Sequence, residues 1–209
     1  MSTEDNIRRI IESIRDENDG LHLDLIIPGY SANKVIGYQG IRQDLFACKD
    51  YVNSLISTEH SPTIGSSLLY SFIALYGRCF TDASSSSSPK LERTDFSSDQ
   101  DELLDLHDEI MSMRHNFVAH RGSTDHETGF AYIKLNTEDL SVQVQVKQVK
   151  RAFPEASKLN SYIVLLNHLI AVAEARFEKA GIRAWKHIRE EYTGEMFAQL
   201  KIAGPTKKS

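Results

Sequence analysis

Apolar residues recur every three to four positions along most of this chain, which is the spacing of one face of an α-helix. The pattern predicts helices over about residues 3–18, 41–57, 62–80, 98–119, 153–180 and 183–200. Ser61 and Pro62 supply a capping side chain and a proline suited to a first helical turn. Gly181 is expected to end or kink the fifth helix. The glycines and the proline of residues 20–40 predict a loop.

Two segments depart from the helical pattern. Residues 129–147 alternate between apolar and polar side chains on either side of Asn136, which predicts a β-hairpin. Residues 81–98 are rich in serine and poor in apolar side chains, which predicts a mobile loop between helices. We therefore expect a single domain over residues 1–209 of the mainly α class. It would be a bundle of five or six helices, with its core at about residues 40–180 and an inserted β-hairpin.

The helical period also predicts which side chains form the core. The inward positions of three helices are expected to be Ile41, Leu45, Cys48, Tyr51, Val52, Leu55, Ile64, Leu68, Phe72, Leu75, Tyr76, Cys79, Leu159, Tyr162, Ile163, Leu166, Leu169, Ile170, Ala173 and Phe177. The two cysteines are far apart and form no C-x-x-C pair, so buried thiols of a reducing compartment are expected. The sequence contains no apolar run of membrane-spanning length, and its acidic first residues lead us to expect no secretory signal. These features predict a cytoplasmic protein.

Charge is distributed unevenly along the chain. The net charge is −5, yet residues 1–146 carry 12 Lys or Arg against 23 Asp or Glu, whereas residues 147–209 carry 12 against 6. The overall negative charge argues against a general nucleic-acid coat. The basic C-terminal part is compatible with a local anion-binding face and equally with an ordinary solvated surface.

Candidate chemistry is concentrated in the segment "LHDEIMSMRHNFVAHRG" at the end of the predicted fourth helix. Advancing about 100° per residue places Arg114 and His120 on the two flanks of the apolar stripe. Asn116 lies beside His120, and Arg121 lies over Arg114, whereas His115 points toward solvent. This arrangement indicates a polar rim beside a buried helix face, where a site could be shared with a neighbouring helix or a second copy of the chain.

These residue types suit reactions at a phosphodiester. Histidine can give or take a proton near neutral pH, and arginine presents a planar fork to phosphate oxygens. Together they can act on a phosphodiester without a metal ion or cofactor. Arg78 and Arg121 are further candidates for phosphate contact. The competing interpretation of each of these groups is a salt bridge or a helix cap.

The motif "RHNFVAH", an arginine followed six positions later by a histidine, resembles the signature of the HEPN superfamily, and its surroundings resemble the abortive-infection type. The resemblance implies a helical bundle that forms a homodimer with the motif at the interface. It further implies a metal-independent endoribonuclease of a defence or toxin–antitoxin system, with RNA and an antitoxin or other partner protein as binding partners. Arg114 and His120 would be the catalytic pair, with either His115 or Asn116 as their polar companion.

Other functions are left open by the sequence. A catalytically inactive HEPN-like module that binds RNA or docks a protein would carry the same motif. The eight acidic residues within residues 92–109 would repel RNA if they faced it. A metal site at His115, His120 and His126 matches no standard spacing. A small-molecule pocket near Tyr70, Tyr76 and Trp185 is a further alternative, whereas a P-loop and a serine-hydrolase elbow are both missing from the sequence.

Overall fold

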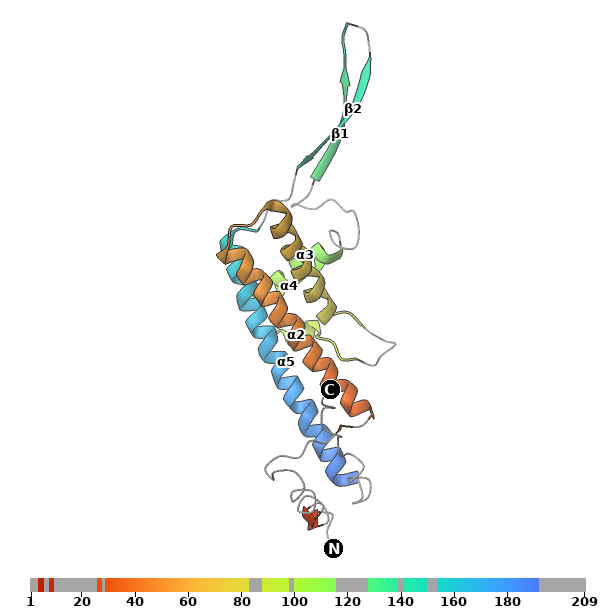
Figure 1. The fold of residues 1–209 in the computed structure, drawn as a ribbon, viewed down its shortest axis with the longest axis vertical. Helices are drawn as coiled ribbons and strands as arrows, with labels where there is room; N and C mark the ends of the chain where they lie inside the picture. The colour runs from red at the N-terminus through yellow and green to blue at the C-terminus, as the bar shows by residue number, and fades with distance from the viewer. Residues whose placement is uncertain are drawn as a thin grey trace, which may run out of the picture. The chain divides into compact units, whose positions relative to one another are not determined.

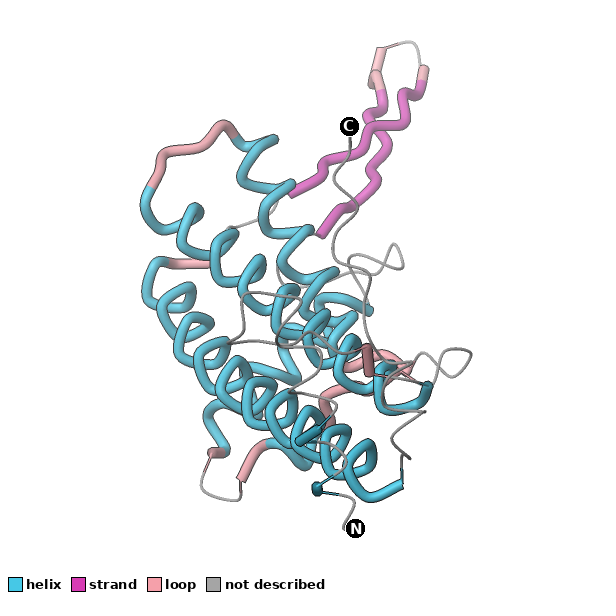
Figure 2. The backbone as a smooth tube through the Cα atoms, turned by 60° about the horizontal axis from the view of Figure 1, so that its bottom comes forward, coloured by secondary structure: helices cyan, strands magenta, loops and turns pink. Residues whose placement is uncertain are grey.

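The structure is a computed structural model that describes residues 4–5, 8–9, 26–27, 29–82, 88–97, 100–115, 128–138, 141–149 and 154–191. Helix dominates these residues, and strand occurs in one hairpin (Figure 1, Figure 2). The α-helices and strands are α2 (Gly29–Ser57), α3 (Pro62–Cys79), α4 (Asp101–Met113), β1 (Thr128–Leu135), β2 (Val142–Val149) and α5 (Ala156–Glu191). The expected mainly helical fold with a small antiparallel sheet is confirmed.

The chain divides into two compact units. The first comprises Met1–Gly40, Asp82–Pro89 and Ala173–Ser209, and the second comprises Ile41–Thr81 and Lys90–Val172. The boundaries fall inside α2 and α5, which are 29 and 36 residues long. Each of these helices therefore contributes one part of its length to each unit.

The second unit has an aromatic core. The ring of Phe72 lies 5.4 Å from that of Tyr162 and 6.0 Å from that of Tyr76, and none of these side chains is exposed. Most predicted core positions are buried, but the prediction was wrong for Ile64, which is 54% exposed. The buried stripe of α3 contains Gly65 instead. Neighbouring helical positions differ by about 100°, so Ile64 is turned toward solvent.

The start of α3 is where the sequence predicted it. The hydroxyl oxygen of Ser61 accepts a hydrogen bond from the backbone N–H of Ile64 at 3.4 Å, and Pro62 occupies the first turn. The serine thereby satisfies one of the N–H groups that a helix start leaves without a partner. Local capping chemistry was sufficient to fix this boundary.

The loop predicted for residues 20–40 was wrong over residues 29–40, which form the beginning of α2. Gly29 has a φ of 58°, a conformation that favours glycine, at the helix start. Gly37 lies inside the helix, and a Cβ atom there would overlap the ring of Pro89. This glycine therefore permits a close approach between two segments of the first unit and does not break the helix.

The predicted helix end at Gly181 was also wrong, because α5 continues to Glu191. A glycine inside a helix costs about 1 kcal/mol relative to alanine. Ala184 and Ile188, one and two turns further on, are buried, and their packing offsets that cost. Most of the helix predicted over residues 3–18, and the part of the last helix beyond residue 191, lie outside the described residues.

The hairpin prediction is confirmed. Leu135 pairs with Val142 and Ile133 pairs with Val144, and the backbone N–H of Asn136 donates to the carbonyl of Ser141 at 2.8 Å. Paired residues of antiparallel strands share one face of the sheet. Ile133 and Val144 are 66% and 75% exposed, so the apolar face of the hairpin is accessible to solvent.

Residues 90–97, at the end of the serine-rich segment, and the two cysteines belong to the second unit. Leu91 and Phe96 are buried, and the N–H of Leu91 donates to the carbonyl of Cys79 at 2.8 Å, so residues 90–97 pack on the core. Cys48 and Cys79 are buried free thiols. Burial raises the pKa of Cys79 to about 12 and raises that of Cys48 as well, which makes both thiols poor nucleophiles. Among the described helices, none has the length and apolar character needed to cross a membrane.

Candidate functional site

The C-terminal end of α4 carries the first part of the motif. The N–H of Arg114 donates to the carbonyl of Ile110, and the backbone widens to a π-type turn at Arg114 and His115. Turns of the π type are rare in proteins overall, but those that occur are often found at functional sites. Arg114 is half-buried and His115 is exposed, as the helical wheel predicted. Asn116, His120 and Arg121 lie outside the described residues.

The side chain of Arg114 lies against Gly77 of α3. A Cβ atom at Gly77 would overlap Cδ of Arg114 and come within 2.5 Å of its Nε. Gly77 is buried, so the arginine stem occupies the space that another residue's side chain would fill. The glycine therefore sets the path along which Arg114 extends from the end of α4. Sequence reasoning missed this contact, although a glycine among large apolar residues of a helix was a visible signal.

His107, two turns before Arg114, belongs to the core. It is 6% exposed, and its Nδ1 is 2.8 Å from the hydroxyl of Tyr76. The rings of Phe80 and Phe96 lie 4.4 and 5.2 Å from the imidazole. Burial lowers the pKa of His107, because a charged imidazolium would lose its hydration there. The structure thus gives Tyr76 and His107 a shared structural role in the core.

We expect His107 to make the protein less stable in mild acid. Its pKa is lowered from 6.5 in the folded state, so below about pH 6.5 the unfolded chain binds a proton that the folded chain does not. The contribution is fully present above pH 6.5 and is lost as the pH falls toward the lowered pKa. Thermal unfolding of His107→Gln between pH 7.5 and 5 should therefore show a smaller drop in Tm than wild type.

The control for this measurement is His187→Gln. His187 lies on α5, where its Nδ1 is 3.0 Å from Glu191, and it is partly exposed. The change in Tm of this variant is the reference for removing a histidine that lies outside the core. An equal drop in Tm for wild type and His107→Gln would show that His107 does not carry the effect.

Two of the acidic residues of α4 are paired with cations. Asp108 forms an ion pair with Arg93, and Glu109 forms one with Lys158. The hydroxyl of Tyr162 also donates to Glu109 at 2.8 Å, and burial together with this contact raises the pKa of Tyr162. These ion pairs therefore offset part of the negative charge of α4 that would repel RNA.

Arg78 is held by a carboxylate. Its Nε donates to Asp44 at 2.7 Å, and its Nη2 forms an ion pair with the other carboxylate oxygen. This hydrogen bond raises the pKa of Arg78, whereas its slight burial opposes the rise. A fork already bound to a carboxylate is less able to receive phosphate, so the geometry favours the salt-bridge interpretation of Arg78.

In the part of the chain that the structure describes, no three histidine, cysteine or acidic side chains lie close enough together to hold a metal ion. His120 and His126, two members of the alternative metal site, are outside these residues.

Comparison with known proteins gives no family assignment. No protein-family model matches the chain, and no curated protein or solved structure is significantly similar to it.

Proposed function

We propose that the chain is a HEPN-like, metal-independent endoribonuclease of a defence or toxin–antitoxin type system. The observation that carries this proposal is the position of Arg114. It follows directly on a core helix of a mainly helical protein, half-buried, with its stem against Gly77. A guanidinium fixed in this way is suited to stabilise charge on a phosphate, because little reorganisation is needed when the charge develops.

In the proposed mechanism, the 2′-OH of RNA attacks the adjacent phosphate. His120 takes part in proton transfer, and Arg114 stabilises the charge that gathers on the phosphate oxygens. The bond to the 5′ oxygen of the next nucleotide breaks, which leaves a 2′,3′-cyclic phosphate and a 5′-OH. His115 or Asn116 would orient one of these groups. The resemblance also implies a homodimer with two motifs at its interface, and an antitoxin or other partner protein.

The test is cleavage of a labelled RNA pool by the purified protein in EDTA, followed by analysis of the product ends. We expect wild type to leave 2′,3′-cyclic phosphates and His120→Ala to be about 10²–10⁴-fold slower, which is the usual contribution of a general acid or base. His187→Ala, a histidine substitution on α5, is the control and should cleave as wild type does.

The proposed dimer and the alternative function are tested with the same proteins. Light scattering during size-exclusion chromatography would measure whether the active form is a dimer. If wild type and His120→Ala are both folded and neither cuts RNA, the ribonuclease proposal is wrong. The catalytically inactive RNA-binding or protein-docking module would then take its place.

A further inference from the structure

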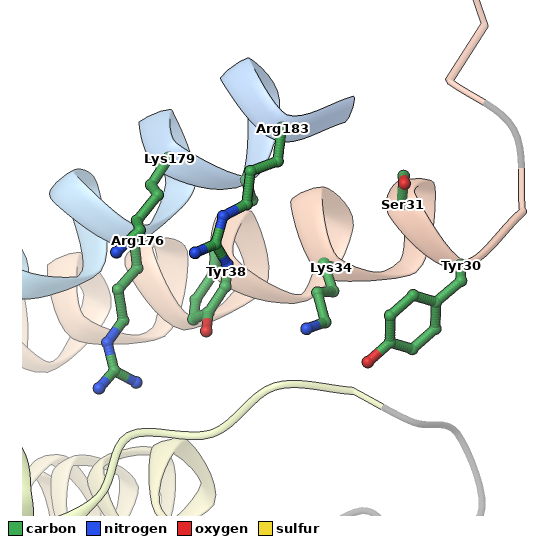
Figure 3. Close-up of a pocket in the computed structure, with 8 residues that line it drawn as sticks. Tyr30, Ser31, Lys34, Tyr38, Arg176, Lys179 and Arg183 are labelled. Carbon is green, nitrogen blue, oxygen red and sulfur yellow. The ribbon is translucent and has the colours of Figure 1, made fainter. Parts of the chain in front are cut away.

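Four cationic side chains gather around one pocket of the first unit. The pocket has a volume of about 300 Å³ and lies between the first turns of α2 and the C-terminal part of α5. Its described lining residues are Tyr30, Ser31, Lys34, Tyr38, Arg176, Lys179, Ala180 and Arg183. None of these eight is acidic. Figure 3 shows Lys34 and Tyr38 of α2 and Arg176 and Arg183 of α5 extending toward the same space.

Helical spacing explains why these side chains converge. Tyr30, Lys34 and Tyr38 are four residues apart, so they form one stripe along α2. Arg176, Lys179 and Arg183 are three and four residues apart and form the matching stripe on α5. The nearby acids Glu174 and Glu178 are each two positions from Arg176, about 160° away around the helix, and do not line the pocket.

The charge and shape of the pocket define its ligand. Lysine ammonium groups supply positive charge to a phosphate, and the planar fork of an arginine matches its oxygens. Tyr30 is 61% exposed, and Nζ of Lys34 lies 4.9 Å from the centre of its ring. An exposed aromatic ring beside phosphate-binding cations is the combination with which proteins hold nucleotides.

We propose that this pocket binds a nucleotide, with its phosphate among Lys34, Lys179 and Arg183 and its base stacked on Tyr30. This site goes beyond the proposed ribonuclease activity, because binding here does not require the Arg114–His120 motif to be catalytic. The same chemistry is offered by a nucleotide within an RNA strand and by a free nucleotide.

Sequence reasoning missed the pocket for an identifiable reason. The basic C-terminal part of the sequence is compatible with an anion-binding face, and three of the pocket's cations come from it. The residues on the other side of the pocket fall in the loop that the glycines of residues 20–40 predict. The signal in the sequence was the four-residue spacing of Tyr30, Lys34 and Tyr38, which places them on one face of a helix.

The first measurement is the affinity for a short fluorescent single-stranded RNA by anisotropy, in a His120→Ala background so that the strand is not cut. Lys34→Ala and Arg183→Ala should each weaken binding about tenfold or more. Each should also reduce the slope of log K against log salt by about 0.7, because one fewer counterion is released. Arg189→Ala, an exposed position of α5 outside the pocket, should leave both the affinity and the slope unchanged.

The second measurement tests whether the base of the nucleotide stacks on Tyr30. Tyr30→Ala should weaken binding about 5- to 150-fold, the usual range for one lost stacking contact, whereas Tyr30→Phe should bind as the parent does. Competition with AMP distinguishes the two sources of the ligand. Displacement of the RNA by AMP at comparable concentration indicates a free nucleotide, and failure of AMP to compete indicates a strand.

Two results would overturn the proposal. One is equal weakening by Arg189→Ala and by the pocket variants, which would mean that any positive charge on α5 suffices. The other is unchanged binding by Tyr30→Ala, combined with competition by pyrophosphate as effective as by AMP, which would exclude recognition of a base. Circular dichroism and Tm of each variant establish that it is folded. Neither result depends on whether the wild-type protein cleaves RNA.

Discussion

Replacing Arg114 by alanine is expected to lower the rate of RNA cleavage by about 10²–10³-fold, the range seen when one preorganised donor to a developing charge is removed. The side chain is half-buried and its stem lies on Gly77, so its guanidinium needs little reorganisation when charge develops on the phosphate. Arg114→Lys keeps the charge but loses the planar fork, and it should recover part of the rate. Single-turnover cleavage of a labelled RNA measures the rates of wild type, Arg114→Ala and Arg114→Lys.

Two further variants test whether cleavage depends on where the Arg114 side chain lies or only on the loss of an arginine. Gly77→Ala places a methyl group where Cδ of Arg114 lies, so the guanidinium must shift and cleavage should fall. Alanine favours helix over glycine by about 0.5–1 kcal/mol, which limits any loss of stability. Arg93→Ala removes an exposed arginine paired with Asp108 and is the matched control. If Arg114→Ala cleaves as fast as Arg93→Ala, Arg114 is not part of the site.

Replacing Phe72 by alanine should lower the free energy of unfolding by about 3–5 kcal/mol. Phe72 is completely buried, with the rings of Tyr76 and Tyr162 within 6.0 Å, so its loss leaves a cavity at the centre of the second unit. Typical domains are stable by about 5–15 kcal/mol, so this single change removes a large fraction of the total. Urea unfolding followed by circular dichroism measures it.

Phe46→Ala is the matched control for this core substitution. Phe46 lies on α2 in the same unit but is 43% exposed, so the same truncation removes less buried surface and leaves no closed cavity. We expect Phe46→Ala to lower the free energy of unfolding by much less than Phe72→Ala does. The slope of that free energy against urea concentration should be unchanged. Equal costs for the two variants would contradict the assignment of Phe72 to the centre of the core.

The sequence by itself determined the elements whose signals are local. Ser61 and Pro62 fixed the start of α3 through capping chemistry, and strict alternation fixed the hairpin, because strand side chains have a period of two. The helical period identified Phe72 and most of the core. It also indicated that Arg114 would lie beside the buried face and His115 would point outward. Each of these features depends on residues within one or two turns of one another.

Tertiary structure decided what depends on contacts between distant segments. Gly37 lies within a helix and permits the close approach of Pro89, and α5 passes through Gly181 because Ala184 and Ile188 are buried further on. The contact of Arg114 with Gly77, and the convergence of Lys34 with Arg183, join residues that no sequence period relates. Local propensities differ by about 1 kcal/mol or less for most residues, so packing of this kind can override them.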